Sequence, residues 1–345
     1  GERFMFRYTP ERFAAETADT EEEAARWLAG DKEARRPPEL LTRDVVARAI
    51  RKEVNAGRGS PHGGAFLDIA SRRSADDIKR KLPSMYHQFK VLAELDITTE
   101  QMEVGPTLHY CMGGIRVDAD SQMSTVSGLF ACGECSGGMH GANRLGGNSL
   151  SDLLVFGKLA GDGAADYIKE LSGFPLINKE KVISIIRNAT EILNRESGMN
   201  PYLLHEELQE VMQNNVGIVR SAELLTAGIE QLDKLKESYK EVKAAGASQF
   251  NPGWHEALAQ RNMIITAEAT ARSALLREES RGAHTRIDFP DERNEFLDVN
   301  VITYKGDDGS MKVKKVNRPE SPAELNRIAN LSIEELEQEI KTGII

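Results

Sequence analysis

The stretch that most constrains the fold is HGANRLGGNSL, residues 140–150. Its glycines allow the backbone to approach a ligand closely. A helix is predicted directly after it, from about residue 149 to 171, and its N-terminus supplies unpaired N–H groups and partial positive charge. Arg144 adds a planar fork that fits a carboxylate with two hydrogen bonds. The pattern predicts a ligand-binding turn; the alternative is a glycine-rich turn with Arg144 in a surface salt bridge.

The region before this turn reads as strands punctuated by glycine, from residue 106 to 134. Residues 115–118 and 123–126 flank a polar turn, which predicts a hairpin. Residues 128–133 form a short apolar run, typical of a buried strand. Glu134 follows it, where a carboxylate is well placed to accept a hydrogen bond from a ribose hydroxyl. The alternative for Glu134 is a solvated loop acid.

Further upstream the pattern is helical. Helices are expected at about residues 20–28, after the plausible N-cap Thr42, over 74–82, and from Ser84 onward. The prolines at 37 and 38 exclude helix between the first two.

Two further side chains, Arg43 and His109, are candidates for chemistry. Arg43 lies in a first helical turn, where a cation opposes the helix dipole, so a functional reason is worth seeking. The alternative is a solvated arginine beside Asp44. His109 precedes a pair of glycines and could bind a substrate oxygen, although a lone histidine in a strand is more often a hydrogen-bonded structural residue.

Cys132 and Cys135 form a C-x-x-C pattern. With His109, Cys111 and His140 nearby in sequence, a zinc site or a thioredoxin-like dithiol is conceivable. Both are disfavoured, because there is no second C-x-x-C and Cys132 falls in the predicted apolar strand. Three cysteines are too few for a disulfide framework, which favours a reducing compartment.

After residue 178, the sequence predicts helices first, and then a hairpin followed by a short helix. Residues 179–280 predict several long antiparallel helices. Residues 299–304 and 312–316 predict a second hairpin, and a short helix is expected near 332–341. Residues 279–290 are dense in charge between helix and loop, and we predict a structural role for them; the alternative is contact with a partner.

Composition narrows the function classes. The chain has 345 residues, is 40% hydrophobic and 28% charged, and carries a formal net charge of −10, so a globular protein of more than one domain is expected and nucleic-acid binding is not. The most apolar run, residues 150–161, is shorter than the roughly 20 residues that cross a bilayer, and Asp152 and Lys158 interrupt it. Without an initiator Met or a signal-peptide pattern, the chain is expected to start inside a longer protein.

Taken in order, these segments resemble the flavoprotein subunit of succinate dehydrogenase and fumarate reductase, and more weakly L-aspartate oxidase of the same superfamily. The resemblance extends over essentially the whole chain, and residues 140–150 are its most specific part. The matching segments are residues 1–5, 42–50, 109–114, 128–134, 140–150 and 279–290.

The resemblance implies roles residue by residue. Arg43 would pass a proton to or from the substrate carbon, and His109 and Arg144 would hold a dicarboxylate. The residues that would contact FAD are Glu134, Asn143, Ser149 and Leu150, and no metal ligand is implied. The implied reaction interconverts succinate and fumarate by hydride transfer to or from FAD, with electrons passed to an iron–sulfur subunit. The alternatives are L-aspartate oxidase and a non-catalytic fragment.

The implied fold class is α/β with α+β additions. Its parts would be a partial substrate-capping domain at 1–105, the second segment of a two-segment FAD-binding domain at 106–172, a helical domain at 173–285 and a small C-terminal region with a hairpin at 286–345. The family's strand, G-x-G-x-x-G turn and helix for the FAD pyrophosphate have no counterpart in the sequence, so we expect a missing N-terminal FAD-binding segment. Iron–sulfur and membrane-anchor subunits would place the protein peripherally on the cytoplasmic face of a membrane.

Overall fold

The computed structural model describes residues 2–344; Gly1, which opens the first matching segment, and Ile345 lie outside them. The chain divides into two compact units, and residues 282–284 return to the first one late in the sequence. The units are Gly1–Ile177 with Gly282–His284, and Asn178–Arg281 with Thr285–Ile345. No helix within residues 2–344 is long and apolar enough to cross a membrane.

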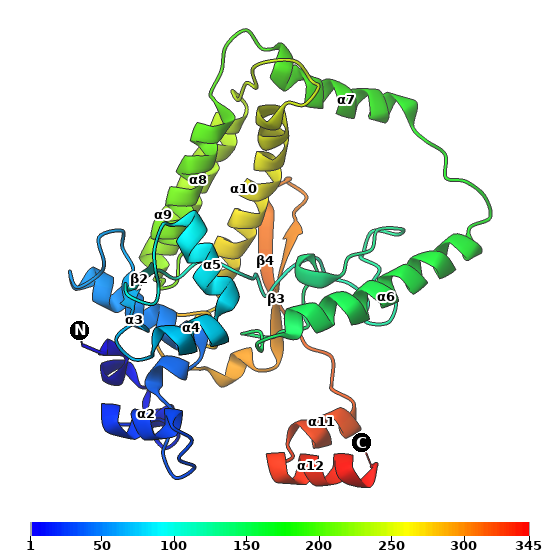
Figure 1. Cartoon of the computed structure of the whole chain (residues 1–345). Helices are drawn as coiled ribbons and strands as arrows, with labels where there is room; N and C mark the ends of the chain where they lie inside the picture. Colours follow the sequence, from blue (N-terminus) through cyan, green and yellow to red (C-terminus); the bar gives the residue numbers. More distant parts are fainter. Residues whose placement is uncertain (1, 345) are drawn as a thin grey trace. The chain divides into compact units, whose positions relative to one another are not determined.

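The first unit combines short helices, one long helix and one small sheet (Figure 1). Its helices are η1 (Phe4–Tyr8), α1 (Glu11–Ala14), α2 (Glu21–Leu28), η2 (Pro38–Leu40), α3 (Arg43–Asn55), α4 (Ala75–Lys81), α5 (Pro83–Leu92), η3 (Gly133–Cys135) and α6 (Asn148–Glu170). Its strands β1 (Ala65–Leu67) and β2 (Met102–Val104) pair antiparallel, with Phe66 opposite Glu103. The helices predicted after Thr42, Ser74 and Gly147 are therefore confirmed.

Helix α3 forms because its apolar positions recur on one side. Val45 and Ala49 are buried against Met5 of η1 and Leu41. Thr42 is the N-cap residue, as predicted, but its side chain makes no capping hydrogen bond. The packing of this apolar face is therefore the main interaction that fixes the start of α3 and Arg43 with it.

The segment from 106 to 147 is mostly irregular, which corrects two predictions. The expected hairpin reduces to a single antiparallel bridge between Val117 and Ser124, and the expected buried strand at 128–133 to a bridge between Met123 and Phe130. Short polar side chains accept hydrogen bonds from nearby backbone N–H groups that would otherwise pair between strands. For example, the Asp118 carboxylate accepts from the N–H of Ser121 at 2.9 Å.

The second unit holds the long helices predicted for residues 179–280 and the predicted C-terminal hairpin. Its helices are α7 (Lys179–Asn194), α8 (Pro201–Asn215), α9 (Ala222–Tyr239), α10 (Pro252–Leu276), η4 (Asn294–Phe296), α11 (Ala323–Ala329) and α12 (Ile333–Thr342). Strands β3 (Val299–Lys305) and β4 (Met311–Asn317) pair antiparallel, with Ile302 opposite Lys314. Since β1–β2 is likewise antiparallel, the fold mixes helices with two small antiparallel sheets, and the finer domain boundaries stay predictions.

Helices α8, α9 and α10 build the largest core (Figure 1). Each buries a residue at every third or fourth position, as Leu225, Ile229 and Leu232 do in α9. Gly228 lies where α8 and α9 approach, since a Cβ there would lie 2.8 Å from Cβ of Asn215. The helical pattern read from residues 179–280 is thereby confirmed.

The charged segment at 279–290 has the predicted structural role. Glu279 is fully buried, and its carboxylate accepts from Arg277 at 2.6 Å and Arg281 at 3.0 Å. Arg286 is also buried and donates to the carbonyl of Ala274 at 2.9 Å, near the end of α10. These arginines hold the turn that follows α10.

We predict that Leu232→Ala destabilises the second unit by about 2–5 kcal/mol, because it leaves a cavity at a fully buried position of the three-helix core. The free energy of unfolding would be measured in urea by the fluorescence of Trp254, which packs on this core, in a Trp27→Phe background. The matched control is Leu203→Ala on α8, where the side chain is 53% exposed and the expected change is within about 0.5 kcal/mol. Equal effects of the two substitutions would contradict the core assignment.

Candidate active site

A buried polar cluster lies in the first unit where the glycine-rich loop enters α6. The Asp152 side chain, in the second turn of α6, is 2% exposed. The Tyr110 hydroxyl donates to its Oδ2 at 2.9 Å. His140 Nε2 lies 3.4 Å from the same oxygen and 3.1 Å from the Tyr110 hydroxyl. Three distant segments of the chain are thus joined at one carboxylate.

The chemistry of the cluster follows from burial. A buried carboxylate is costly unless it is hydrogen-bonded, and Tyr110 and His140 supply the partners of one Asp152 oxygen. The other oxygen, Oδ1, is buried without a hydrogen-bond partner among the described residues. The ring of His140 also meets the ring of Tyr110 edge-on, with centroids 5.2 Å apart. The cluster is therefore fixed by ring packing as well as by hydrogen bonds.

The same surroundings keep Tyr110 protonated. Burial, the hydrogen bond to Asp152 and the negative charges of Asp152 and Glu134 raise the pKa of Tyr110 to about 12, against the opposing charge of Arg144. The tyrosine hydroxyl is therefore a neutral donor at physiological pH.

Arg144 lies over this cluster. Its guanidinium carbon is 4.7 Å from the centroid of the Tyr110 ring, and Nη1 donates to the carbonyl of Leu145 at 3.2 Å. Nε is buried without a partner, and no residue within 2–344 accepts from Nη2. Arg144 is half-buried, and the alternative of a surface salt bridge is not realised among these residues. The guanidinium keeps donors available for a ligand.

A second contact joins this loop to the start of α3. Asn143 Nδ2 donates to Asp44 Oδ1 at 3.4 Å, and Arg48 Nη2 donates to Asp44 Oδ2 at 2.7 Å. Arg43 precedes Asp44 and is exposed, with no hydrogen bond or ion pair to another described residue. Arg43 adjoins Asp44 and Arg144 adjoins Asn143 in the sequence. The Asn143–Asp44 hydrogen bond therefore brings the two predicted arginines into the same region.

His109 and Glu134 lie on adjoining loops. His109 is exposed and directly precedes Tyr110. The carboxylate of Glu134 accepts from the N–H of Cys111 at 3.0 Å, which ties the two loops together. Glu134 is in η3 and not at the end of a strand, which corrects the structural context predicted for it. The structure therefore gathers the sequence-predicted residues into one region of the first unit.

The tripeptide 282–284 completes this region. The N–H of Ala283 donates to the carbonyl of Ala142 at 3.0 Å, and Arg48 Nη1 lies 3.4 Å from the carbonyl of Gly282. Gly282 has φ +58, and a Cβ there would lie 2.5 Å from the Ala142 oxygen. Only glycine fits this close approach without displacing the loop.

The structure gives no support to the cysteine alternatives. Cys132 is half-buried and is the N-cap residue of η3, outside any strand. The Cys135 thiol donates to the carbonyl of Cys132 at 3.2 Å, and both thiols are free. Across residues 2–344, no group of three or more His, Cys, Asp or Glu side chains could hold a metal ion.

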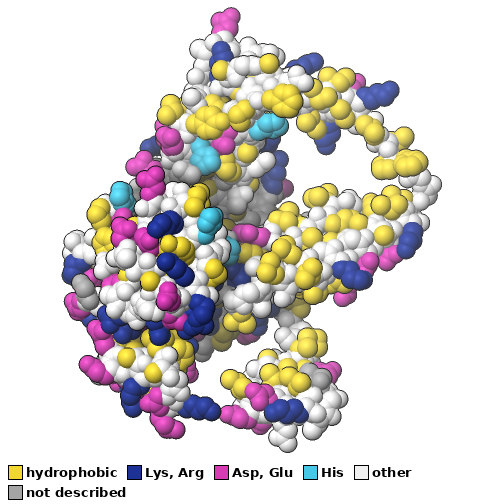
Figure 2. Space-filling view, viewed as in Figure 1, with side chains coloured by type: hydrophobic (Ala, Val, Ile, Leu, Met, Phe, Trp, Pro, Cys, Tyr) yellow, Lys and Arg dark blue, Asp and Glu magenta, His cyan; other side chains and the backbone are white. Residues whose placement is uncertain are grey.

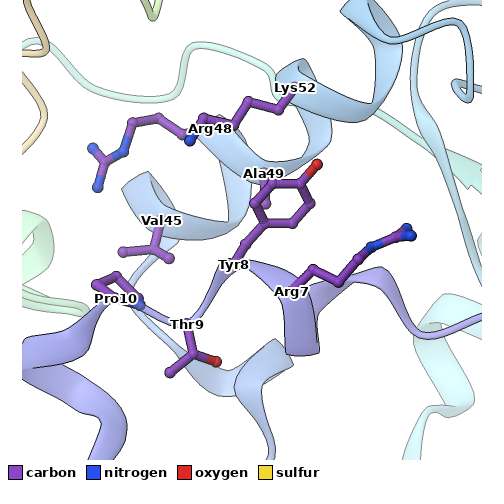
Figure 3. Close-up of a pocket in the computed structure, with 8 residues that line it drawn as sticks. All are labelled: Arg7, Tyr8, Thr9, Pro10, Val45, Arg48, Ala49 and Lys52. Carbon is purple, nitrogen blue, oxygen red and sulfur yellow. The ribbon is translucent and has the colours of Figure 1, made fainter.

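A pocket of about 310 Å³ opens beside this region, between η1 and α3 (Figure 3). Its lining residues are Arg7, Tyr8, Thr9, Pro10, Val45, Arg48, Ala49 and Lys52. Arg7 is paired with Glu53 at 3.5 Å and Arg48 with Asp44, and Figure 3 shows the two guanidinium groups pointing away from each other. The pocket therefore offers no converging set of free charges.

Sequence reasoning missed the roles of Tyr110, His140 and Asp152. The available signal was Asp152 itself, a carboxylate inside the most apolar run of the chain. A buried acid in such a run requires hydrogen-bond donors, but the sequence does not say which distant residues supply them.

The residues around the start of α6 suit the ring end of a flavin. Gly147, at φ +84, precedes the helix, and no side chain caps it. The N–H groups of Asn148 and Leu150 donate to the carbonyls of Leu145 at 3.2 Å and Gly147 at 3.0 Å, whereas that of Ser149 has no acceptor among the described residues. Leu150 and Leu154 are 68% and 77% exposed, and Figure 2 shows apolar side chains along this helix. The free N–H of Ser149 beside an apolar face matches an aromatic ring system with polar oxygens. The set fits the flavin ring and contains no loop for a pyrophosphate.

Two family models match the chain. The model for an FAD-binding domain matches residues 1–150, and the model for the C-terminal part of the fumarate reductase flavoprotein matches residues 205–339. The first match lies in the first unit, and the second lies mostly in the second unit.

Curated relatives agree with these models. The chain is 40% identical over 308 residues to a CoM/CoB fumarate reductase protein of Methanothermobacter marburgensis, covering 88% of this chain and 50% of the relative. It is 33% identical over 286 residues to the fumarate reductase flavoprotein subunit of Escherichia coli, covering 80% and 47%. The chain thus spans about half the length of the curated relatives it matches.

Solved structures show the same fold. Sdh1 of Mycobacterium smegmatis in complex with UQ1 matches with a TM-score of 0.77 and 48% identity, covering 88% of this chain and 51% of that one. A quinol–fumarate reductase with menaquinol molecules matches with a TM-score of 0.74 and 31% identity, covering 83% and 51%.

We predict that Asp152→Asn lowers the pKa of Tyr110 from about 12 toward the ordinary value of 10.0, because the charge that retains the phenol proton is removed. The titration would be followed by tyrosinate absorbance, and the late step would be assigned by its loss in Tyr110→Phe. Tyr86→Phe on α5 is the matched control and should leave that step in place.

The pKa shift of Tyr110 also predicts a pH dependence of stability. The folded pKa lies above that of an unfolded tyrosine, so the unfolded chain loses this proton first. The free energy of unfolding in the wild type should therefore fall as pH rises from about 10 to about 12, and less so in Tyr110→Phe. Identical slopes in the two proteins would contradict the contact.

Proposed function

Because this chain belongs to the flavoprotein family of succinate dehydrogenase and fumarate reductase, we propose that it binds a dicarboxylate and, together with FAD, interconverts succinate and fumarate. FAD is the cofactor of this family of FAD-dependent oxidoreductases.

The observation that carries the proposal is the contact between Asn143 and Asp44. It joins the glycine-rich loop to the start of α3 and so brings the neighbouring residues Arg144 and Arg43 into one region. A dicarboxylate needs a cation for a carboxylate group and a proton donor near its central carbons. The two arginines supply these functions from two independent elements.

Each residue then has a distinct role. Arg144 would bind one carboxylate through its free guanidinium donors, and His109 would hold a second substrate oxygen. Arg43 would deliver a proton to the substrate carbon when fumarate is reduced. An arginine is ordinarily protonated, so it acts most simply as an acid. Accepting a proton during succinate oxidation would require a relay from Arg43 to a further group.

FAD, when bound, would accept the hydride from succinate or supply it to fumarate. The residues that would hold its ring are Ser149 and Leu150, whose backbone opens α6, with Asn143 and Glu134 on the adjoining loops. The exposed Glu134 carboxylate has one oxygen engaged by Cys111, which leaves the other for a hydroxyl. The pyrophosphate would be bound by residues outside this chain, because the sequence has no G-x-G-x-x-G turn.

The partners follow from the same family. Electrons would pass to an iron–sulfur subunit, and membrane-anchor subunits would hold the assembly at the cytoplasmic face of a membrane. The proposal is supported by the fumarate reductase flavoprotein subunit of Escherichia coli, and by matching structures of Sdh1 with UQ1 and of quinol–fumarate reductase with menaquinol.

We predict that Arg43→Gln lowers the rate of flavin reduction by succinate by about 10²–10⁴-fold, because the proton-transferring group is lost while the dicarboxylate site remains. The measurement is the bleaching of the visible flavin band after adding succinate to the FAD-loaded protein, assembled with the N-terminal FAD-binding segment. Dicarboxylate affinity should change little.

The control is Arg51→Gln, two turns further along α3, which should reduce flavin at the wild-type rate. Full activity in Arg43→Gln would overturn the catalytic role of Arg43. Bleaching by L-aspartate instead of succinate would replace the proposal with an amino-acid oxidase. The absence of a flavin band after assembly with the N-terminal segment would favour a non-catalytic fragment.

A further inference from the structure

The substrate arginine is held by few contacts of its own. Its hydrogen bond to the carbonyl of Leu145 reaches only the next residue and leaves the guanidinium plane free to turn. The remaining contact is the ring of Tyr110, 4.7 Å from the guanidinium carbon. The position of Arg144 therefore depends on what holds Tyr110.

Tyr110 is held by its hydroxyl. That oxygen lies within hydrogen-bonding distance of Asp152 Oδ2, at 2.9 Å, and His140 Nε2, at 3.1 Å. Asp152 belongs to α6 and His140 to the glycine-rich loop, so the phenol is fixed from two elements. The ring above it then presents one face to Arg144 as a flat cation platform.

We propose that Tyr110, fixed by His140 and Asp152, is a positioning residue that holds the Arg144 guanidinium in the orientation that binds a dicarboxylate. This inference rests on the proposed function, because it assigns to Arg144 a carboxylate ligand. It concerns residues to which the family resemblance gave no role.

A purely structural role would not require this chemistry. Buried charges contribute little net stability, and an apolar set of similar size packs as well. Asp152 nevertheless keeps one oxygen without a partner, and Arg144 keeps its Nε buried without one. These unmet hydrogen bonds cost free energy that an apolar set would not, so their presence points to a role in orienting the arginine and not in stability.

The test uses Tyr110→Leu, which removes the platform, and Tyr110→Phe, which keeps the ring and loses only the hydroxyl. In the FAD-loaded protein, the dissociation constant of malonate, a dicarboxylate that cannot be dehydrogenated, is expected to rise about tenfold in Tyr110→Leu. It should rise roughly threefold in Tyr110→Phe and in Asp152→Asn. For succinate, KM should rise by more than kcat falls, because the change acts on binding.

A second readout does not depend on activity. The rate at which phenylglyoxal modifies Arg144, mapped by peptide mass spectrometry without dicarboxylate, should increase severalfold in Tyr110→Leu and less in Tyr110→Phe. The control is Tyr86→Leu on α5, which removes a comparable cation–ring contact, with Lys79 at 5.1 Å, outside the site. It should change neither malonate binding nor Arg144 reactivity.

The outcomes separate the two proposals. Unchanged malonate affinity and unchanged Arg144 reactivity in Tyr110→Leu would overturn the positioning role. If the wild-type protein binds no malonate, the proposed function fails, and Arg144 reactivity alone then decides whether Tyr110 positions the guanidinium. Equal losses in Tyr110→Leu and Tyr86→Leu would indicate general destabilisation and overturn the inference.

Discussion

The carboxylate of Asp152 is the constraint on which the candidate site depends. It is nearly sealed from solvent in the second turn of α6, and Tyr110 and His140 converge on it. A buried charge must be met by donors, so the loops that carry those donors have little freedom to move. Regular structure is scarce between residues 106 and 147. The hydrogen bonds of the buried Asp152 to Tyr110 and His140 hold these loops instead of strand pairing.

A small number of contacts also positions the start of α3. Apolar packing of Val45 and Ala49 fixes the helix, and Asp44 then reaches the glycine-rich loop through Asn143. The side chains proposed to bind a carboxylate and to donate a proton, Arg144 and Arg43, are thereby placed by the half-buried Asp44 and the exposed Asn143. A rigid framework with adaptable outer groups is the common arrangement of sites built on loops.

Most helices could be predicted because their signals are local. The predicted start and end of the helix after Gly147 differ by one residue from α6, and the apolar period of α9 is visible in the sequence. The strands expected before η3 failed because Asp118 and similar side chains bond the adjacent backbone. In the site, Arg144 was recognisable from its glycine-rich setting. Its support by Tyr110 was not, because that contact joins segments whose proximity only the fold determines.

The return of residues 282–284 to the first unit has a consequence for synthesis. The carbonyl of Ala142 can accept from the N–H of Ala283 only after residues 178–281, which carry α7 to α10, have been translated. A growing chain therefore exposes an unfinished glycine-rich loop while α8, α9 and α10 emerge and fold from local contacts. The contact of the late tripeptide with this loop can therefore form only after these helices have been made.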